Sequence, residues 1–215
     1  MIKTTLKISC VIGLSIFLTG MGKPIGEIKP ALNSSSSLLI GSKAPEFTLP
    51  NSFGNSISLS QFRGKRVILE WKNHQCPFVK KHYHSGNMQN TQALAKKNGY
   101  VWLSIISSAP GKQGYVSGKK ANEIVENENS LATHVLLDPK GKVGHLYKAK
   151  TTPHMFIISE TGNLLYKGAI DSIPTPVKSD VKEATNYVHQ VINELKSKKQ
   201  ISVSETKPYG CSVKY

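Results

Sequence analysis

The chain has few cysteines and few arginines. Its 215 residues include three cysteines, Cys10, Cys76 and Cys211, and its arginines are limited to Arg63 and Arg66. This cysteine count excludes a disulfide-dense scaffold, and no Cys-x-x-Cys pair is present. No apolar run reaches the ~20 residues that a membrane-spanning helix needs. We therefore expect no stable membrane span in the mature chain.

Acidic residues are also scarce. The formal net charge is +15, and neither Asp nor Glu occurs between residues 71 and 122. The basic residues are mostly scattered lysines with few aromatic residues near them, a pattern typical of a solvated basic surface. We expect no nucleic-acid partner, whereas attraction to an anionic membrane surface stays open.

The N-terminal segment has the pattern of an export signal. Lys3 and Lys7 precede the apolar run 8–18, and small residues follow around residues 19–22. This order predicts a signal peptide over 1–22, followed by a Pro- and Ser-rich flexible linker over 23–40. A protein processed in this way is periplasmic or secreted, where disulfides persist.

The rest of the chain alternates between strand and helix patterns. Apolar runs predict strands at 67–71, 101–106 and 135–137, a short hairpin at 47–49 and 57–59, and a second hairpin at 155–158 and 164–166. Helical patterns cover 77–97 with a break near Ser85-Gly86, then 119–129 and 181–195. This order predicts one α/β domain with a mixed sheet over 41–198 and a tail over 199–215.

Cys76 lies where an apolar strand turns into a helix. Pro77 suits the first helical turn because its φ is already helical and its missing N–H is not needed there. A thiol at this junction faces free backbone N–H groups and the positive end of the helix dipole, which both favour the thiolate. Cys76 is therefore a candidate nucleophile.

Several motifs together resemble a known family. They are Ala-Pro-Glu-Phe-Thr-Leu at 44–49 with Gly64-Lys65, the segment 70–83 around Cys76, Thr-Thr-Pro-His at 151–154, and the ending 207–215. On these residues the chain resembles the exported peroxiredoxin-like redoxins of the AhpC/TSA group, within the thioredoxin-fold superfamily. The resemblance implies a thioredoxin-like fold, with a mixed central sheet flanked by helices, an N-terminal β-hairpin extension and a C-terminal tail.

The same resemblance implies a thiol–disulfide oxidoreductase or antioxidant protein without a cofactor. It assigns to Pro153 the role of a cis-proline facing the active cysteine. Thr152 would then present backbone groups to an extended thiol or disulfide partner beside Cys76. An ordinary trans-proline turn at this position is the alternative.

Two departures from related families limit this expectation. Thioredoxins carry a second cysteine where this chain has Val79. Peroxiredoxins share a Pro-x-x-x-Thr/Ser-x-x-Cys segment, but Leu69 and Asn73 occupy its first and fifth positions here, and no arginine follows Arg66. Without that cation the cleavage of a peroxide O–O bond lacks charge stabilisation. We therefore expect weak or no true peroxidase activity.

Cys211 is the candidate resolving partner of Cys76. The segment after the last predicted helix is long enough, when extended, to cross a small domain. Gly210 would let the backbone approach closely, and Tyr209 and Tyr215 could hold the tail by packing. In this hypothesis Cys76 attacks a protein disulfide or a small oxidant, Cys211 forms an intramolecular disulfide, and an external thiol reductant resets the pair. The alternative is a non-catalytic interaction module with a structural Cys76–Cys211 bridge.

Three further residues could support Cys76. Asn73 could orient the loop by hydrogen bonding or cap the helix. His74 and Lys80 could lower the pKa of the Cys76 thiol or move protons, or they could simply lie exposed beside it.

A copper or zinc site is a further alternative. The candidate ligands would be His74, Cys76, His82, His84 and His154. The Cys-x-x-x-Cys pair of thioredoxin-fold copper-delivery proteins is missing, and His82 and His84 point to different sides of a helix. We therefore expect no metal.

Overall fold

The computed structural model describes residues 1–2 and 38–215. The predicted signal peptide and most of the predicted linker, residues 3–37, lie outside the described residues. Leu38 falls inside the predicted linker, yet it is buried, and its carbonyl accepts a hydrogen bond from the Lys167 ammonium. The end of that segment therefore packs on the domain, because an apolar side chain there finds a place in the core.

A five-stranded mixed sheet forms the centre of the domain, in the order β5-β4-β3-β7-β8. The strands are β3 (Val67–Trp71), β4 (Val101–Ile106), β5 (His134–Leu137), β7 (His154–Ile158) and β8 (Leu164–Gly168). β3, β4 and β5 are parallel, while β7 pairs antiparallel with both β3 and β8. The central strands are mostly apolar because both faces of the sheet are covered, with Glu70 and Ser104 as buried polar exceptions in β3 and β4.

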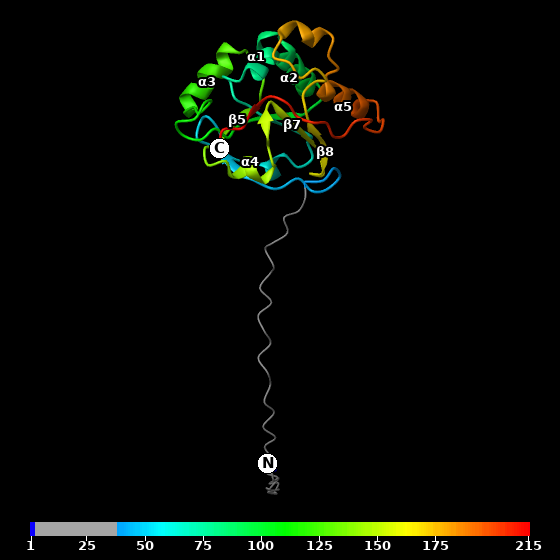
Figure 1. Cartoon of the computed structure of the whole chain (residues 1–215). Coiled ribbons are helices and arrows are strands. Elements are labelled where there is room, and N and C mark those ends of the chain that lie inside the picture. The colour runs from blue at the N-terminus through cyan, green and yellow to red at the C-terminus, as the bar shows by residue number, and fades with distance from the viewer. Residues whose placement is uncertain (3–37) are drawn as a thin grey trace, which may run out of the picture. The chain divides into compact units, whose positions relative to one another are not determined.

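Helices cover both faces of this sheet (Figure 1). They are α1 (Pro77–His84), α2 (Asn87–Lys97), α3 (Gly118–Asn127), α4 (Lys142–Leu146) and α5 (Tyr187–Lys196). Side chains of α1, α2 and α5 share one apolar cluster, which also contains Cys76. Val143 of α4 and the adjacent Tyr147 belong to a second cluster on the opposite face. The expected mixed sheet flanked by helices is confirmed.

The N-terminal hairpin consists of β1 (Thr48–Pro50) and β2 (Ser56–Ser58), which pair antiparallel and lead into the 3-10 helix η1 (Leu59–Phe62). Leu49 and Ile57 turn into the same cluster as Tyr147, so the hairpin covers the α4 side of the sheet.

The predicted helix over 181–195 is wrong in its first part. A 3-10 helix, η2 (Lys178–Lys182), comes first, and α5 begins only at Tyr187. The side chain of Asn186 accepts the N–H of His189, which is the usual start of a helix. This cap explains why Val181 and Ala184, though in phase with the later apolar face, do not belong to α5.

The C-terminal tail crosses the end of the sheet. Its strand β9 (Cys211–Ser212) pairs antiparallel with β6 (Thr151–Thr152), which places Cys211 opposite Thr152. The chain ends beside α4, where the Tyr215 ring stacks on His145 with ring centroids 4.0 Å apart. Figure 1 shows this tail in red, running past β7. No helix within residues 38–215 has the length and apolar character to cross a membrane.

Candidate functional site

Cys76 and Cys211 meet beneath the docked tail. Cys76 is the residue directly before α1, in an extended conformation, and Pro77 is the first helical residue. Its Sγ lies 2.7 Å from the Sγ of Cys211 and 3.1 Å from the carbonyl oxygen of Thr152. Both cysteines are free thiols. Cys76 is 0% exposed, whereas Cys211 is partly accessible, so an incoming reagent meets Cys211 and the tail first.

The two thiols differ in acidity. Burial raises the pKa of the Cys76 thiol, but interactions with Cys211, with Thr152 and with the backbone of Val79 outweigh it and hold this pKa below its ordinary value. Burial and the adjacent Cys76 raise the pKa of Cys211 to about 11. The first proton of the pair is therefore lost from Cys76, while Cys211 stays protonated and donates to the thiolate.

Asn73 shapes the loop before Cys76. Its Oδ1 accepts the N–H of Gln75 at 2.9 Å, and its carbonyl accepts the N–H of Cys76 at 3.0 Å. Its Nδ2 donates to the carbonyl of Gln113 at 3.3 Å. A side chain at Gly114 would collide with this amide, because a Cβ there would lie 2.4 Å from Oδ1. Asn73 therefore orients the turn, and the helix-capping alternative does not hold because Cys76 occupies the capping position.

Thr152 and Pro153 lie directly beside the sulfur pair. The Thr152–Pro153 peptide bond is cis, as the resemblance implied. Gly210 adopts a φ of +128°, and a Cβ there would lie 2.1 Å from the Thr152 oxygen. Only glycine fits this close approach, which brings the next residue, Cys211, onto Cys76.

The side chains of His74 and Lys80 make no hydrogen bond to the Cys76 thiol, although the backbone N–H of Lys80 donates to the Cys76 carbonyl at 2.9 Å. His74 is partly buried, and its pKa is lowered by burial and by the neighbouring Lys72 and Lys80. Lys80 is exposed. Neither residue is among the groups that lower the pKa of Cys76, so their supporting role stays a sequence-based prediction.

Sequence reasoning missed a buried network that anchors the tail. The Tyr209 hydroxyl donates to the Asp171 carboxylate and lies 3.1 Å from Nε2 of His82. The Lys81 ammonium lies 3.1 Å from the second oxygen of Asp171, and both side chains are almost fully buried. The available signal was the position of Asp171 after the apolar residues that end at Ile170, since a buried carboxylate requires a cation or several donors.

The candidate metal ligands do not gather at one place. No group of three or more His, Cys, Asp or Glu side chains within the described part of the chain is arranged to hold a metal ion. His82 instead hydrogen-bonds to Asn87 and Tyr209, and His154 accepts the backbone N–H of Lys150.

Comparisons with known proteins fit this arrangement. The model of the AhpC/TSA family matches residues 40–167, more than half of the chain, including Cys76 and Pro153 but not Cys211. Two Mycobacterium tuberculosis proteins named as candidate peroxiredoxins are 47% identical over 38 residues, which is 18% of this chain and 24% of each relative. The match thus spans about a quarter of the length of these curated relatives.

Solved structures share the fold at low sequence identity. A hypothetical protein from Sinorhizobium meliloti is 19% identical with a TM-score of 0.68, covering 83% of this chain and 96% of that one. An uncharacterized conserved protein from Geobacillus kaustophilus is 21% identical with a TM-score of 0.68, covering 84% and 94%. A thiol:disulfide interchange protein from Bacteroides sp. is 21% identical with a TM-score of 0.50, covering 68% and 90%. The chain therefore belongs to the AhpC/TSA family and has a thioredoxin-like fold.

Proposed function

We propose that this protein is a thiol–disulfide oxidoreductase in which Cys76 is the nucleophile and Cys211 the resolving thiol. One observation carries the proposal. Two free thiols lie 2.7 Å apart, with the pKa of one lowered and that of the other raised. Such a pair provides a thiolate for attack and a second thiol within bonding reach.

The proposed cycle conserves atoms and electrons. The Cys76 thiolate attacks one sulfur of a partner disulfide, forms a mixed disulfide and releases the other partner sulfur as a thiolate, which takes a proton. Cys211 then loses its proton and attacks the Sγ of Cys76, which releases the second partner thiol and leaves a Cys76–Cys211 disulfide. The partner gains two electrons, and an external dithiol restores the pair by the reverse exchange.

The tail indicates how a partner would be held. β9 already occupies the edge of β6, and its strand pairing covers Cys76. When the tail leaves, the backbone groups of Thr152 become an open strand edge that an extended, cysteine-bearing segment of another protein could pair with. We therefore favour a protein disulfide as the substrate.

A small hydroperoxide is a less suitable substrate. The two arginines of the chain are engaged elsewhere, Arg63 with Glu46 and Arg66 with Glu160. No arginine is thus left to stabilise the departing oxygen of a peroxide at Cys76. Any peroxidase activity should be slow, with Cys76 oxidised to a sulfenic acid that Cys211 condenses with, releasing water.

A structural role of the pair is the second candidate. It is favoured by the number of anchors on the tail, since Tyr209 contacts Asp171 and the Tyr215 hydroxyl donates to the carbonyl of Ala149 at 2.8 Å. In that case the two cysteines would only fix the tail in an interaction module.

The reduction potential of the pair separates the two candidates. Full-length protein would be equilibrated in thiol redox buffers, alkylated and analysed by mass spectrometry. A midpoint between about −300 and −120 mV supports a cycling pair, and a midpoint well below this range makes the bridge structural. With a model disulfide, Cys211→Ser should accumulate a mixed disulfide at Cys76, and Cys76→Ser should form none. Absence of a mixed disulfide in Cys211→Ser would contradict the assignment of the nucleophile.

We also propose that the protein is exported, with the segment 1–22 removed and the domain beginning near Leu38, which packs into the core. The motivation is the signal pattern at the N-terminus, and disulfide exchange suits a compartment outside the cytoplasm. N-terminal sequencing of the protein recovered from cell fractions tests this. A cytoplasmic product that keeps residues 1–22 would contradict it.

A further inference from the structure

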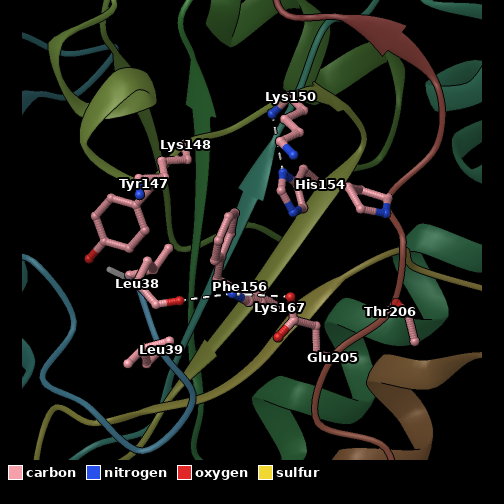
Figure 2. Close-up of a pocket in the computed structure, with 11 residues that line it drawn as sticks. Leu38, Leu39, Tyr147, Lys148, Lys150, His154, Phe156, Lys167, Glu205 and Thr206 are labelled. Atoms are coloured by element: carbon pink, nitrogen blue, oxygen red, sulfur yellow. Dashed lines mark hydrogen bonds and ion pairs between the residues drawn. The ribbon is translucent and has the colours of Figure 1, made fainter. Parts of the chain in front are cut away.

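A second site lies apart from the cysteine pair. A cavity of about 210 Å³ is bounded by β7, the residues after α4, β8 and the tail residues 205–208. Figure 2 shows Tyr147, His154, Phe156 and Lys167 around it. Phe156 and Tyr147 belong to the apolar cluster on the α4 side of the sheet, whereas Cys76 belongs to the cluster on the other side. The cavity therefore cannot be an extension of the thiol site.

His154 supplies an unused hydrogen-bond donor to this cavity. It is 5% exposed, and its Nδ1 accepts the backbone N–H of Lys150 at 3.3 Å. Burial, with the nearby Lys150 and Lys167, lowers the pKa of His154 to about 3, so the ring is neutral. Because Nδ1 is an acceptor, the hydrogen-bond network assigns the proton to Nε2. Nε2 has no hydrogen-bond partner among the described residues, and because His154 lines the cavity, this N–H can donate to a molecule bound there.

The charges around the cavity favour an anion. Lys148, Lys150 and Lys167 line it, against one carboxylate, Glu205. Lys167 is already engaged, 3.1 Å from Glu205 and bonded to the carbonyl of Leu38 at 2.8 Å. Lys148 and Lys150 make no ion pair with any described residue. Figure 2 places the side chain of Lys150 beside the ring of His154.

Most of the remaining lining is apolar. The rings of Phe156 and Tyr147 and the side chain of Leu38 are buried in the core and border the cavity. An occupant must therefore combine an apolar body with an acceptor at one end. A phosphate offers several charged oxygens and no apolar surface, which one neutral histidine donor and these walls would match poorly.

We propose that this cavity binds a small monocarboxylate with an apolar body. The carboxylate accepts the Nε2–H of His154 and pairs with the Lys150 ammonium, while the body packs on Phe156 and Tyr147. Both interactions are of the kind that orients a ligand in a largely apolar pocket.

Ligand binding at this site should also hold the tail. The tail residues 205–208 form one wall, and the N–H of Thr206 donates to the carbonyl of Lys167 at 3.1 Å. A ligand that contacts this wall binds the protein more tightly when the tail is docked than when it is released. Its binding therefore shifts the equilibrium toward the docked state. Hydrogen exchange at Thr206 should therefore slow when the carboxylate is present.

Benzoate is a suitable probe, with benzamide as its neutral isostere and inorganic phosphate as the non-apolar anion. Full-length protein with ¹⁵N-labelled histidine would be titrated and followed by the ring resonances. We expect a saturable shift of His154 with benzoate, no comparable shift of His189, and at least tenfold weaker binding of benzamide and phosphate. The titration of the His154 resonance in the wild-type protein tests the proposal by itself, even if a variant fails to fold.

Variants then test the contacts. His154→Phe should weaken benzoate binding at least tenfold, and Lys150→Met should weaken it and reduce its salt dependence. The control Lys142→Met changes an exposed lysine outside the cavity and should bind benzoate as the wild type does. Unsaturable titration, equal binding of benzamide or phosphate, or undiminished binding by folded His154→Phe would each overturn the proposal. None of these readings depends on redox turnover, so failure here leaves the function of Cys76 untouched.

Discussion

The reactivity of Cys76 depends on its spatial neighbours as well as on its place before a helix. The acidifying groups include Cys211 and Thr152, which approach from segments far away in the sequence. Cys211→Ala removes a hydrogen-bond donor to the thiolate, so the pKa of Cys76 should rise. Cys211→Ser keeps a hydroxyl donor and should raise it less. Ultraviolet titration of thiolate absorbance measures both, and a titration midpoint for Cys76 in Cys211→Ala no higher than in Cys211→Ser would contradict this view.

Two adjacent lysines of α1 should differ sharply in their contribution to stability. Lys81 is 1% exposed and pairs with the buried Asp171, whereas Lys80 is exposed. Lys81→Met leaves a buried carboxylate without its cation, which should lower the free energy of unfolding by about 3–5 kcal/mol. Lys80→Met should change it by less than about 0.5 kcal/mol.

Urea denaturation followed by circular dichroism measures this difference. The double variant Lys81→Met, Asp171→Asn should recover part of the loss, because no unpaired charge is then buried. Equal stability of the two single variants would show that the Lys81–Asp171 pair is not needed for the fold.

Single residues were predictable where local backbone chemistry fixes them. Cys76 before a helical proline and the close approach at Gly210 could be inferred from the sequence, and the cis bond at Pro153 from the family resemblance. The network of Lys81, Asp171 and Tyr209 could not, because it joins α1, the residue after Ile170 and the tail. Such contacts depend on tertiary packing, which no local pattern specifies.

At the scale of elements, the pairing of β9 with β6 controls access to Cys76. Gly210 fits only because it lacks a Cβ, which would collide with the Thr152 carbonyl. Gly210→Ala should therefore release the tail and leave the sheet intact. The expected result is faster alkylation of Cys76 by a neutral reagent, with an unchanged far-ultraviolet spectrum.

Gly111→Ala is the matched control for that experiment. Gly111 also has a positive φ, +75°, but a Cβ there meets no atom within 4 Å. Its alanine variant carries the backbone strain without the collision, so alkylation of Cys76 should keep its wild-type rate. Equal acceleration in both variants would attribute the effect to general destabilisation.

The predictability of the elements follows their length and periodicity. β3 and β4 were predicted with their observed limits because each is an apolar run with a single polar residue, Glu70 in β3 and Ser104 in β4. α4, β6 and β9 were missed, since these short elements have neither an apolar run nor a regular period. The last helix was predicted too early because its apolar phase extends backward past the Asn186 cap.

At the scale of the whole molecule, the fold keeps histidines neutral inside a basic protein. The pKa of His82 is lowered to about 4, mainly by burial and further by Lys81, although Asp171 opposes this. The pKa of His154 is lowered to about 3, again mainly by burial. Both rings accept or share hydrogen bonds that a protonated ring would lose, His82 with Asn87 and His154 with Lys150.

This arrangement predicts sensitivity to acid. Between pH ~6.5 and ~4 the unfolded chain binds a proton at residue 82 that the folded chain does not, so acidification favours unfolding. This loss of stability is absent above pH ~6.5, the pKa of histidine in the unfolded chain, and complete below pH ~4, the pKa of His82 in the folded chain. Between these values the free energy of unfolding falls by about 1.4 kcal/mol per pH unit for each such histidine.

His82→Gln should therefore show a shallower fall of unfolding free energy across this window, measured by urea denaturation at a series of pH values. His84→Gln changes an exposed histidine of the same helix and is the matched control, which should keep the wild-type slope. If His82→Gln retained the full wild-type slope, protonation of the buried ring would not be what limits stability in acid.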